Sequence, residues 1–319
     1  MSLLGVDLGG TKLAVTQFSF EGSVLHKENI SLAGRHGKDV GSLITGTIAD
    51  VLHSKQYKNP VKSIGISVPG ISRMKTGTVW APNIPGWDDY PLLKEVQAVS
   101  GEIPVTMESD RACSILGETW QGKANGCKDA IFLAVGTGIG AGIMVNGSIL
   151  RGAHDISGAV GWMALVRPYE DEYKDCGCFE YYASGNGIAR VAHNVLKEHV
   201  NYKGQLRYKR GEEVTAHDIF AAFKLNDPIA IEVLNICIGL WGMAIANLVS
   251  IFNPEKIILG GGVFGPAVQF IPAIKKEALK WAQPISIHQV SVEASALGSE
   301  AGVYGAGFMA LQAIHPSDK

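Results

Sequence analysis

The sequence has little charge and almost no excess of one sign. Charged residues make up 18% of its 319 residues, and the formal net charge is −2. This balance gives no electrostatic reason to bind nucleic acid or an anionic membrane, so we expect neither as a partner. Hydrophobic residues make up 46%, which is enough for a large core and excludes a disordered chain.

Cysteine is also scarce, and its count is odd. The five cysteines are scattered, and only Cys176 and Cys178 lie close together. The chain opens on "LLGVDLGG" after Met1 and Ser2, without the charged n-region and cleavage site of a secretory signal. Both features predict a reduced, cytoplasmic protein.

Only one segment is apolar enough to be mistaken for a membrane span. Residues 233–252, "VLNICIGLWGMAIANLVSIF", contain no charged residue. They do contain Asn235, Asn247 and Ser250, and no cluster of lysine or arginine flanks them. We therefore predict a helix buried in a globular core and no membrane partner.

Strand-like runs separated by glycine turns open the chain and then recur. "LLGVDL", "KLAVTQF" and "VLHKENI" form one such meander, and residues 129–152 form another. "EGSVL" at 21–25 corresponds to "NGSIL" at 146–150. This repetition predicts an internal duplication of one α/β unit, with domains at 1–118 and 119–319. The last helix, near 298–313, is a candidate for packing back on the first domain.

Apolar spacing and turn residues predict the remaining elements. We expect Asp110 to be the N-cap of the helix that follows "EIPVTMES". The other helices are predicted at 39–55, 186–199, 216–223, 228–252 and 266–282, and the other strands at 61–70, 256–262 and 285–292.

Two nucleotide motifs are present without their structural context. "GETWQGKA" at 117–124 ends in Ala124 where a Walker A loop needs a hydroxyl, and it follows a helix. "GTGIGA" at 136–141, with Asp155 further on, matches the dinucleotide fingerprint. That fingerprint requires a helix next, whereas a β-hairpin is predicted here, so a dehydrogenase is a distant reading.

Three glycine turns are better candidates for holding a nucleotide. Hairpins formed by "DLGGTK" at 7–12 and "GTG" at 136–138 would direct backbone N–H groups at phosphates from two sides. Thr11 and Lys12 add a hydroxyl and a cation, and Asp7 could hold Mg²⁺ through water. Side-chain-free Gly260, Gly261 and Gly262 would let a nucleoside lie on the backbone. Any one of these turns alone would be read as an ordinary hairpin.

In this order the motifs resemble the ROK family of sugar kinases and sugar-responsive regulators. The similarity covers nearly the whole chain and includes GVDLGGTK, ISVPG, APNIPGW, ESDRACSILGE, VGTGIGAGIMVNGSILRGAH, CFEYYASG, LGGGV and ALGSEAGVYGA. It implies a duplicated, actin/hexokinase-like (ribonuclease H-like) two-domain α/β fold with a central cleft. Regulators of the family carry a helix-turn-helix domain before this region. Because only Met1–Leu4 precede the first motif, we expect the kinase branch.

The resemblance also assigns roles to residues. Asp110 matches the general base that accepts a proton from the sugar hydroxyl. The matching substrate-binding positions are Asn83, Ser109, Asp110, Glu180 and Gly70. The positions that match the ATP-binding elements are Asp7, Gly9, Gly10, Thr11, Lys12, Gly136, Thr137, Gly138, Gly260, Gly261 and Gly262. ATP and Mg²⁺ are the implied cofactors, a sugar is the implied small-molecule partner, and a homodimer is the implied assembly, although no residue demonstrates it.

The family pattern breaks where a zinc site is usual. The family's Glu-Asn-Asp becomes Glu-Ser-Asp at 108–110, and its sugar-binding Glu and zinc-binding His become Ala159 and Trp162. "DCGCFE" is too short for the usual three cysteines and leaves only Cys178 at a ligand position. Four-coordinate structural zinc needs more ligands, so we expect none. Trp162 is expected either to stack on a sugar face or to fill the core.

The sequence thus predicts an ATP-dependent sugar kinase that phosphorylates a hydroxyl, expected to be the primary one, of a hexose or hexose derivative. A non-catalytic sugar- or nucleotide-binding regulatory protein of the same fold is the alternative. It is favoured by the altered residues Ala159, Trp162, Cys176 and Cys178, which leave open whether activity is lost or only specificity has changed. The sequence does not identify the sugar.

Overall fold

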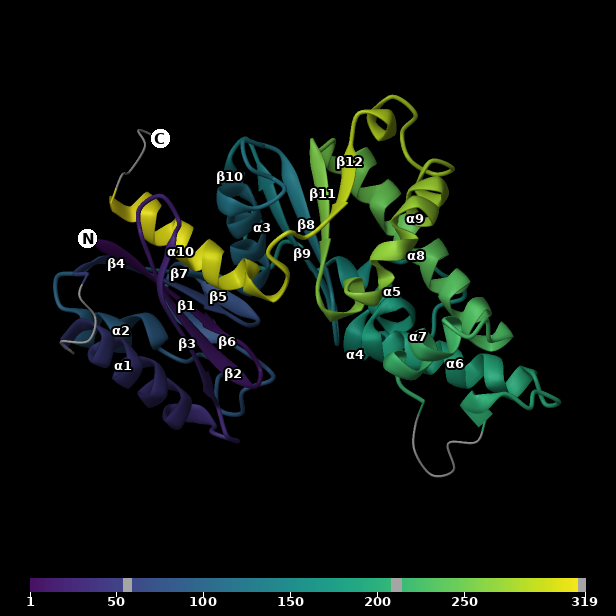
Figure 1. Ribbon diagram of the computed structural model, residues 1–319, viewed down its shortest axis with the longest axis horizontal. Coiled ribbons are helices and arrows are strands. Elements are labelled where there is room, and N and C mark those ends of the chain that lie inside the picture. The colour runs from purple at the N-terminus through teal and green to yellow at the C-terminus, as the bar shows by residue number, and fades with distance from the viewer. Residues whose placement is uncertain (54–58, 208–213, 315–319) are drawn as a thin grey trace.

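Two five-stranded sheets with corresponding strand orders form the framework of the molecule (Figure 1). The structure is a computed structural model that describes residues 1–53, 59–207 and 214–314. The order is β3-β2-β1-β4-β7 in the N-terminal sheet and β10-β9-β8-β11-β12 in the C-terminal sheet. In each sheet the first three strands form an antiparallel meander and the next two join it in parallel. The two halves therefore share one topology.

The strands follow the predicted alternation with glycine turns. The N-terminal sheet contains β1 (Ser2–Leu8), β2 (Lys12–Phe18), β3 (Val24–Ser31), β4 (Val61–Val68) and β7 (Val105–Ser109). The C-terminal sheet contains β8 (Ala130–Val135), β9 (Ile139–Val145), β10 (Ser148–Ile149), β11 (Lys256–Gly260) and β12 (Ser291–Ala294). A separate hairpin joins β5 (Ile71–Arg73) to β6 (Thr78–Trp80).

Helices cover both sheets. They are α1 (Gly37–His53), α2 (Leu92–Ser100), α3 (Asp110–Gln121), α4 (Tyr173–Cys176), α5 (Cys178–Ala183), α6 (Gly185–Glu198), α7 (Ala216–Phe223), α8 (Pro228–Phe252), α9 (Ile271–Ala278) and α10 (Ala301–Ile314). Short 3-10 helices lie at Val160–Trp162, Gln205–Arg207, Gly262–Phe264, Pro266–Phe270, Ser286–His288 and Gly298–Glu300. The predicted helix 39–55 is present as α1, and its residues 54 and 55 lie outside the described part of the chain.

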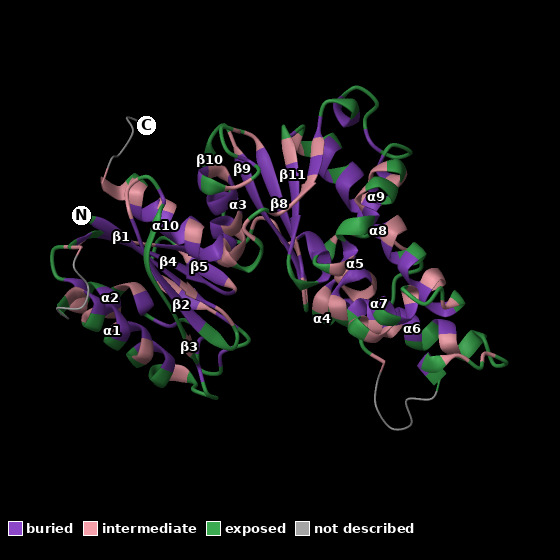
Figure 2. Cartoon of the chain, in the orientation of Figure 1, coloured by how far each residue is buried: buried purple, intermediate pink, exposed green. Residues whose placement is uncertain are grey.

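Apolar side chains fill the space between each sheet and its helices, and Figure 2 shows these buried layers in both halves. In the N-terminal half, α1 buries Val40, Ile44 and Ile48, which recur at helical spacing. In the C-terminal half, α8 is apolar on most sides and lies in the largest buried cluster.

Helix α8 is long and apolar enough to cross a membrane by length and composition, and 61% of its most apolar 18-residue window is buried in the fold. Trp241 is fully buried, and its Nε1 donates a hydrogen bond to the Ala183 carbonyl at 3.0 Å. Burial against α5 and α6 explains the apolar composition as that of a core helix in a soluble protein.

Glycines allow two helices to pack closely on the sheets. A Cβ at Gly65 of β4 would lie 1.8 Å from the Ala306 carbonyl oxygen of α10. A Cβ at Gly142 of β9 would lie 2.0 Å from the Arg111 carbonyl oxygen of α3. The two helices also meet each other, because a Cβ at Gly305 would lie 1.8 Å from the Cys113 carbonyl oxygen. Helix α10 thus packs on the N-terminal sheet and on α3 (Figure 1).

Several predicted boundaries were wrong for local reasons. The strand predicted at 256–262 ends at Gly260, because Gly261 turns the chain with a φ of 86°. The helix predicted at 266–282 is a 3-10 turn followed by α9, which begins where Pro272 can occupy the first turn. The segment 285–292 is mostly a 3-10 turn, and only its end enters β12.

Candidate active site

Asp110 lies at the junction of β7 and α3. The predicted N-cap role was wrong: Ser109 is the N-cap, and its Oγ accepts from the Ala112 N–H at 3.4 Å. Asp110 is the first helical residue, and its Oδ1 accepts from the Arg111 N–H at 2.8 Å. Burial raises the pKa of Asp110, and the Arg111 cation opposes this shift. A carboxylate of raised pKa at a helix start is suited to accept a proton.

The first glycine hairpin lies beside this carboxylate. The Gly9 N–H donates to the Lys12 carbonyl at 2.9 Å and closes the turn, which leaves Thr11 and Lys12 exposed. Burial raises the pKa of Asp7 to about 6, and the charge of Asp110 contributes to that rise. The electrostatic coupling places the two carboxylates in one site.

Asn83 also reaches this hairpin. Its Nδ2 lies 3.4 Å from the position that a Cβ at Gly10 would occupy. The loop is held by Trp87, which is buried, stacks on Tyr90 with ring centroids 4.4 Å apart, and donates from Nε1 to the Gly37 carbonyl at 2.9 Å. Asn83 itself remains exposed, with an amide free to face a ligand.

Arg111, which the sequence motifs did not predict, connects the two halves. Its Nη2 donates to the carbonyl of Gly70 at 3.2 Å, and its Cδ lies 2.5 Å from the position of a Cβ at Gly140. Gly70 must be glycine, because its φ is 79° and a Cβ would lie 2.1 Å from the Trp80 carbonyl oxygen. The sequence feature that could have identified Arg111 is its position directly after Asp110, where a cation can affect the pKa of the candidate base.

The second hairpin is built like the first. The Gly136 N–H donates to the Gly138 carbonyl at 2.9 Å, and Thr137 is exposed at the tip. The Ile139 N–H donates to Glu180 Oε2 at 2.6 Å, and that oxygen lies 2.8 Å from the position of a Cβ at Gly138. Burial raises the pKa of Glu180, and the Ile139 bond and Arg190 partly offset this effect. Glu180 is thus fixed against the hairpin.

A glycine-lined surface adjoins this hairpin. The Gly185 N–H donates to the Gly136 carbonyl at 2.7 Å, and a Cβ at Gly136 would lie 4.0 Å from the Gly262 nitrogen. A Cβ at Gly262 would meet nothing within 4 Å, so this position is open. Gly260 differs, because a Cβ there would lie 2.2 Å from the Phe132 ring, and Gly261 occupies the turn. The surface has the form of a backbone cradle that side chains would fill.

The predicted residues therefore form two groups. Asp7, Gly9, Gly10, Thr11, Lys12, Asn83, Gly70, Ser109 and Asp110 belong to the N-terminal group, and Gly136, Thr137, Gly138, Glu180, Gly260, Gly261 and Gly262 belong to the C-terminal group. Arg111 lies between them, since it touches Gly70 on one side and Gly140 on the other.

Two further polar contacts join the halves. Arg151 Nε donates to Glu108 Oε2 at 2.6 Å, and Glu108 is buried. The Met74 N–H donates to Asp155 Oδ2 at 3.2 Å. Asp155 thus holds the β5–β6 hairpin, and the "GTGIGA" segment runs into strand β9 rather than a helix, against the dinucleotide reading.

The cysteine segment contains two unpaired thiols. Cys178 is buried with its Sγ 3.9 Å from the Val166 carbonyl oxygen, and Cys176 is half-buried. Within residues 1–53, 59–207 and 214–314, no group of three or more His, Cys, Asp or Glu side chains could hold a metal ion. Trp162 is 56% exposed, so the alternative that it fills the core was wrong. Absence of zinc remains a prediction.

Comparison with known proteins is consistent with this geometry. The model of the ROK family matches residues 3–313. A glucokinase of Halalkalibacterium halodurans is 34% identical over 99% of this chain and 97% of its own. A xylose repressor of Caldicellulosiruptor bescii is 29% identical over 95% of this chain and 76% of its own.

A solved structure also matches across the whole fold. It is a ROK family glucokinase from Streptomyces griseus in complex with glucose and AMPPNP, with a TM-score of 0.76, 28% identity and coverage of 98% of this chain and 100% of the other. The predicted actin/hexokinase-like two-domain α/β fold is thereby confirmed. The exact domain boundary at residue 118 remains a prediction.

Proposed function

Because the chain belongs to the ROK family, which it matches over residues 3–313, we propose that it is an ATP-dependent sugar kinase. It transfers the γ-phosphate of ATP to a hydroxyl, the primary one by our prediction, of a hexose or hexose derivative. The observation that carries this proposal is the pair of glycine hairpins, with the carboxylate of Asp110 next to the first of them.

In the proposed reaction Asp110 is the general base. The sugar hydroxyl gives its proton to the Asp110 carboxylate as its oxygen forms a bond to the γ-phosphorus. The bond between that phosphorus and the β,γ-bridging oxygen breaks, and ADP leaves with the electron pair. The Arg111 cation opposes the effect of burial on the pKa of Asp110 and so favours the ionised form, which accepts the proton.

The phosphates bind between the two hairpins. Backbone N–H groups at Gly10, Thr137 and Gly138 and the Lys12 cation are the donors for phosphate oxygens. The N–H groups of Gly9 and Gly136 close the two hairpins and are not among these donors. The nucleoside lies on the glycine cradle at Gly136, Gly185 and Gly262. These features fit a nucleotide because an added Cβ at several of these positions would meet backbone or carboxylate atoms.

The residues also fit a magnesium ion. Asp7 is a half-buried carboxylate whose pKa is raised to about 6, and a cation nearby would favour its ionised form. When bound, Mg²⁺ neutralises charge that develops on the phosphates. Among the described residues Asp7 is the carboxylate of the first hairpin that would hold it, directly or through water.

The sugar lies between Asn83 and Glu180. The exposed Asn83 amide supplies a donor and an acceptor for sugar hydroxyls, and the Glu180 oxygen not bonded to Ile139 accepts from another. Ser109 can contribute its hydroxyl proton as a donor, while its oxygen accepts from the Ala112 N–H at the start of α3. Gly70 shapes this side through its bond to Arg111.

A coupled assay of ADP release over a panel of hexoses, amino sugars and polyols tests the proposal. We expect ATP- and Mg²⁺-dependent turnover of at least one hexose or hexose derivative. Titration of the same compounds by calorimetry identifies binding that is not followed by transfer. Binding without turnover of every candidate would contradict the kinase assignment.

The second candidate is a non-catalytic sugar-binding regulatory protein. It is motivated by the similarity to the xylose repressor and by Ala159 and Trp162 in place of polar sugar contacts. The same calorimetry distinguishes it, since a sensor binds a sugar and releases no ADP. The intact Asp110 and both intact hairpins favour the kinase.

We further propose a homodimer in the cytoplasm. Reduced cysteines and the family resemblance support these assignments. Light scattering after size-exclusion chromatography would give a mass close to 68 kDa, twice the chain mass of 33.9 kDa, for a dimer.

A further inference from the structure

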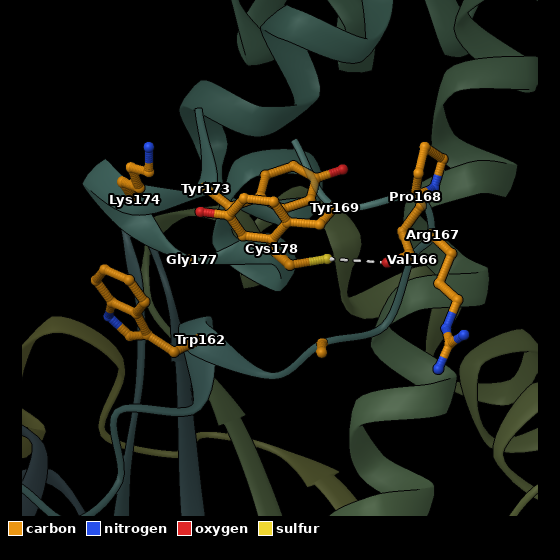
Figure 3. A pocket seen from close by; sticks show the side chains of 10 residues that line it. Trp162, Val166, Arg167, Pro168, Tyr169, Tyr173, Lys174, Gly177 and Cys178 are labelled. Carbon is orange, nitrogen blue, oxygen red and sulfur yellow. Dashed lines mark hydrogen bonds between the residues drawn. The ribbon is translucent and has the colours of Figure 1, made fainter. Parts of the chain in front are cut away.

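A large pocket lies in the C-terminal half beside the cysteine segment. Its volume is about 1020 Å³, at the upper end of the range of small-molecule sites. Figure 3 shows its lining, in which Tyr169 and Tyr173 lie between Trp162 on one side and Arg167 on the other. The remaining lining residues are Ala164, Val166, Pro168, Lys174, Gly177 and Cys178.

The lining combines exposed aromatic faces with cations. Trp162 is 56% exposed and Tyr169 is 65% exposed. Tyr169 is held edge-on against Tyr173 with centroids 5.7 Å apart, and Tyr173 shares a hydrogen bond of 2.8 Å with the hydroxyl of Tyr182. Rigid aromatic faces bind flat apolar ring surfaces. The Arg167 and Lys174 cations are hydrogen-bond donors, and Lys174 pairs with Asp171 at 2.8 Å.

The wall of the pocket adjoins residues of the proposed sugar site. A Cβ at Gly177 would lie 2.6 Å from the Trp162 Cα, so the pocket wall packs on the start of α5. A Cβ at Gly161 would lie 3.1 Å from Glu180 Oε2. Trp162 therefore directly follows Gly161, which lies against Glu180.

The same chain of contacts leads to the base. Glu180 Oε2 accepts from the Ile139 N–H at 2.6 Å. The next residue, Gly140, lies against the side chain of Arg111, which directly follows Asp110. Glu180 thus lies between the base and the pocket in this chain of contacts.

We propose that this pocket is a subsite for a ring-shaped substituent on the substrate, so that the preferred substrate is a glycoside rather than a free hexose. The proposal rests on the proposed kinase function and specifies its substrate class. A second sugar ring and an aryl group offer the same flat apolar face. Both can be attached at the anomeric carbon, which leaves the primary hydroxyl free to react. Trp162 and Tyr169 would stack on this ring, and Arg167 would donate to its oxygens.

Matched pairs of substrates test this subsite. For each hexose of the panel, kcat/KM is measured for the free sugar, its phenyl glycoside and a disaccharide that carries it at the non-reducing end. We expect glycosides to exceed the free hexose about tenfold, which is ~1.4 kcal/mol, mainly through a lower KM. The disaccharide and the phenyl glycoside distinguish a sugar from an aryl group as the occupant.

Trp162→Ala should reduce the ratio of glycoside to hexose kcat/KM to near one, and Tyr169→Ala should lower it by a smaller factor. Trp281→Ala is the matched control. Trp281 is exposed to a similar extent, 61%, and it is not among the residues that line the pocket. Its ratio should equal that of the unaltered protein. Thermal unfolding of each variant verifies that the fold is retained.

The outcomes separate the two proposals. A wild-type ratio near one for every pair, or a ratio that Trp162→Ala leaves unchanged, would overturn the subsite while the kinase function stands. A changed oligomer mass in Trp162→Ala with an unchanged ratio would identify the pocket as a subunit interface. If no sugar is phosphorylated, the kinase proposal fails, and calorimetric binding of phenyl glycosides to wild type and Trp162→Ala still tests the pocket: equal affinity, or no binding, overturns it.

Discussion

The two halves of the molecule have the same sheet topology but contribute different chemistry. Each sheet carries a glycine hairpin between its first two strands, closed by one backbone hydrogen bond of 2.9 Å. The first hairpin is flanked by Asp7 and Lys12, whereas the second has Thr137 at its tip and no charge of its own. Duplication has thus kept the backbone geometry, which glycine and strand pairing determine, while the side chains have diverged.

The two helices that pack on the sheets, α3 and α10, also occupy corresponding positions and carry different side chains. Helix α10 packs against Gly5 and Gly65 of the N-terminal sheet, and α3 packs against Gly140 and Gly142 of the C-terminal sheet. Helix α10 begins beside Asp7 of the first hairpin, whereas α3 begins at Asp110 beside the same hairpin and reaches the C-terminal sheet through Arg111. The start of α3 carries Asp110, whereas the start of α10 carries glycine at 302, whose backbone faces Asp7. Only one of the two equivalent helix starts supplies a carboxylate.

Replacing that carboxylate should have the largest effect. Asp110→Ala removes the proposed proton acceptor and should lower kcat by about 10²–10⁴-fold, while ATP still binds. Steady-state kinetics and calorimetric titration with ATP measure the two quantities. Asp171→Asn is the control, since Asp171 is exposed and forms a surface ion pair with Lys174. The kcat of this variant should be unchanged.

The pH dependence identifies the group. Because burial raises the pKa of Asp110, the active ionised form is lost as pH falls through that raised value. Activity should therefore decline on the acid side and level off at higher pH, and Asp110→Ala should lack this decline. Near-normal turnover in Asp110→Ala, or an unchanged acid limb, would remove Asp110 from the mechanism.

The close packing of α10 on Gly65 can be tested by measuring the free energy of unfolding. In Gly65→Ala the new Cβ would lie 1.8 Å from the Ala306 carbonyl oxygen, and backbone would have to move. We expect the free energy of unfolding to fall by about 1–3 kcal/mol or more. Gly46→Ala is the matched control on the exposed side of α1, where a Cβ meets nothing within 4 Å. It should raise stability by about 1 kcal/mol, and denaturant unfolding measures both.

The hairpins should differ in their contribution to ATP binding. Lys12→Ala removes a cation and should raise KM for ATP about tenfold, whereas Thr137→Ala removes a neutral hydroxyl and should raise it only about two- to threefold. Kinetics at saturating sugar and varied ATP measure both. Equal effects would mean that the second hairpin contributes as much side-chain chemistry as the first.

Much of the fold was predictable because it depends on local patterns. Alternating strands and glycine turns located both meanders, and helical spacing located α1 and α8. The boundaries that failed depend on single residues such as Pro272 and Gly261, whose effect varies with their exact position in a turn. The Ser109 cap was missed because both Ser and Asp accept from helix N–H groups, and spacing does not choose between them.

The site was only partly predictable. Motifs located Asp110, Asn83 and Glu180, but not the contact of Arg111 with both Gly70 and Gly140, which depends on how the halves pack. Nor did they indicate that Trp162 and Tyr169, which are seven positions apart in the sequence, line the same pocket. Such long-range contacts are properties of tertiary packing, which sequence spacing does not encode.

The segment around Cys178 has no counterpart among the described elements of the N-terminal half. Replacing Cys178 should have the smallest effect of the changes considered. Cys178 is the first residue of α5 and is only 5% exposed. Tyr173 of α4 and Phe179 of α5 are also buried, so side-chain packing can order the segment without metal. Mass spectrometry of the purified protein should find well below one zinc per chain, and EDTA should leave the thermal midpoint unchanged. Cys178→Ser should cost only about 1 kcal/mol, the effect of placing a hydroxyl where a weakly polar thiol was buried. About one zinc per chain, lost in Cys178→Ser, would show instead that a metal orders this segment through ligands that the usual spacing does not reveal.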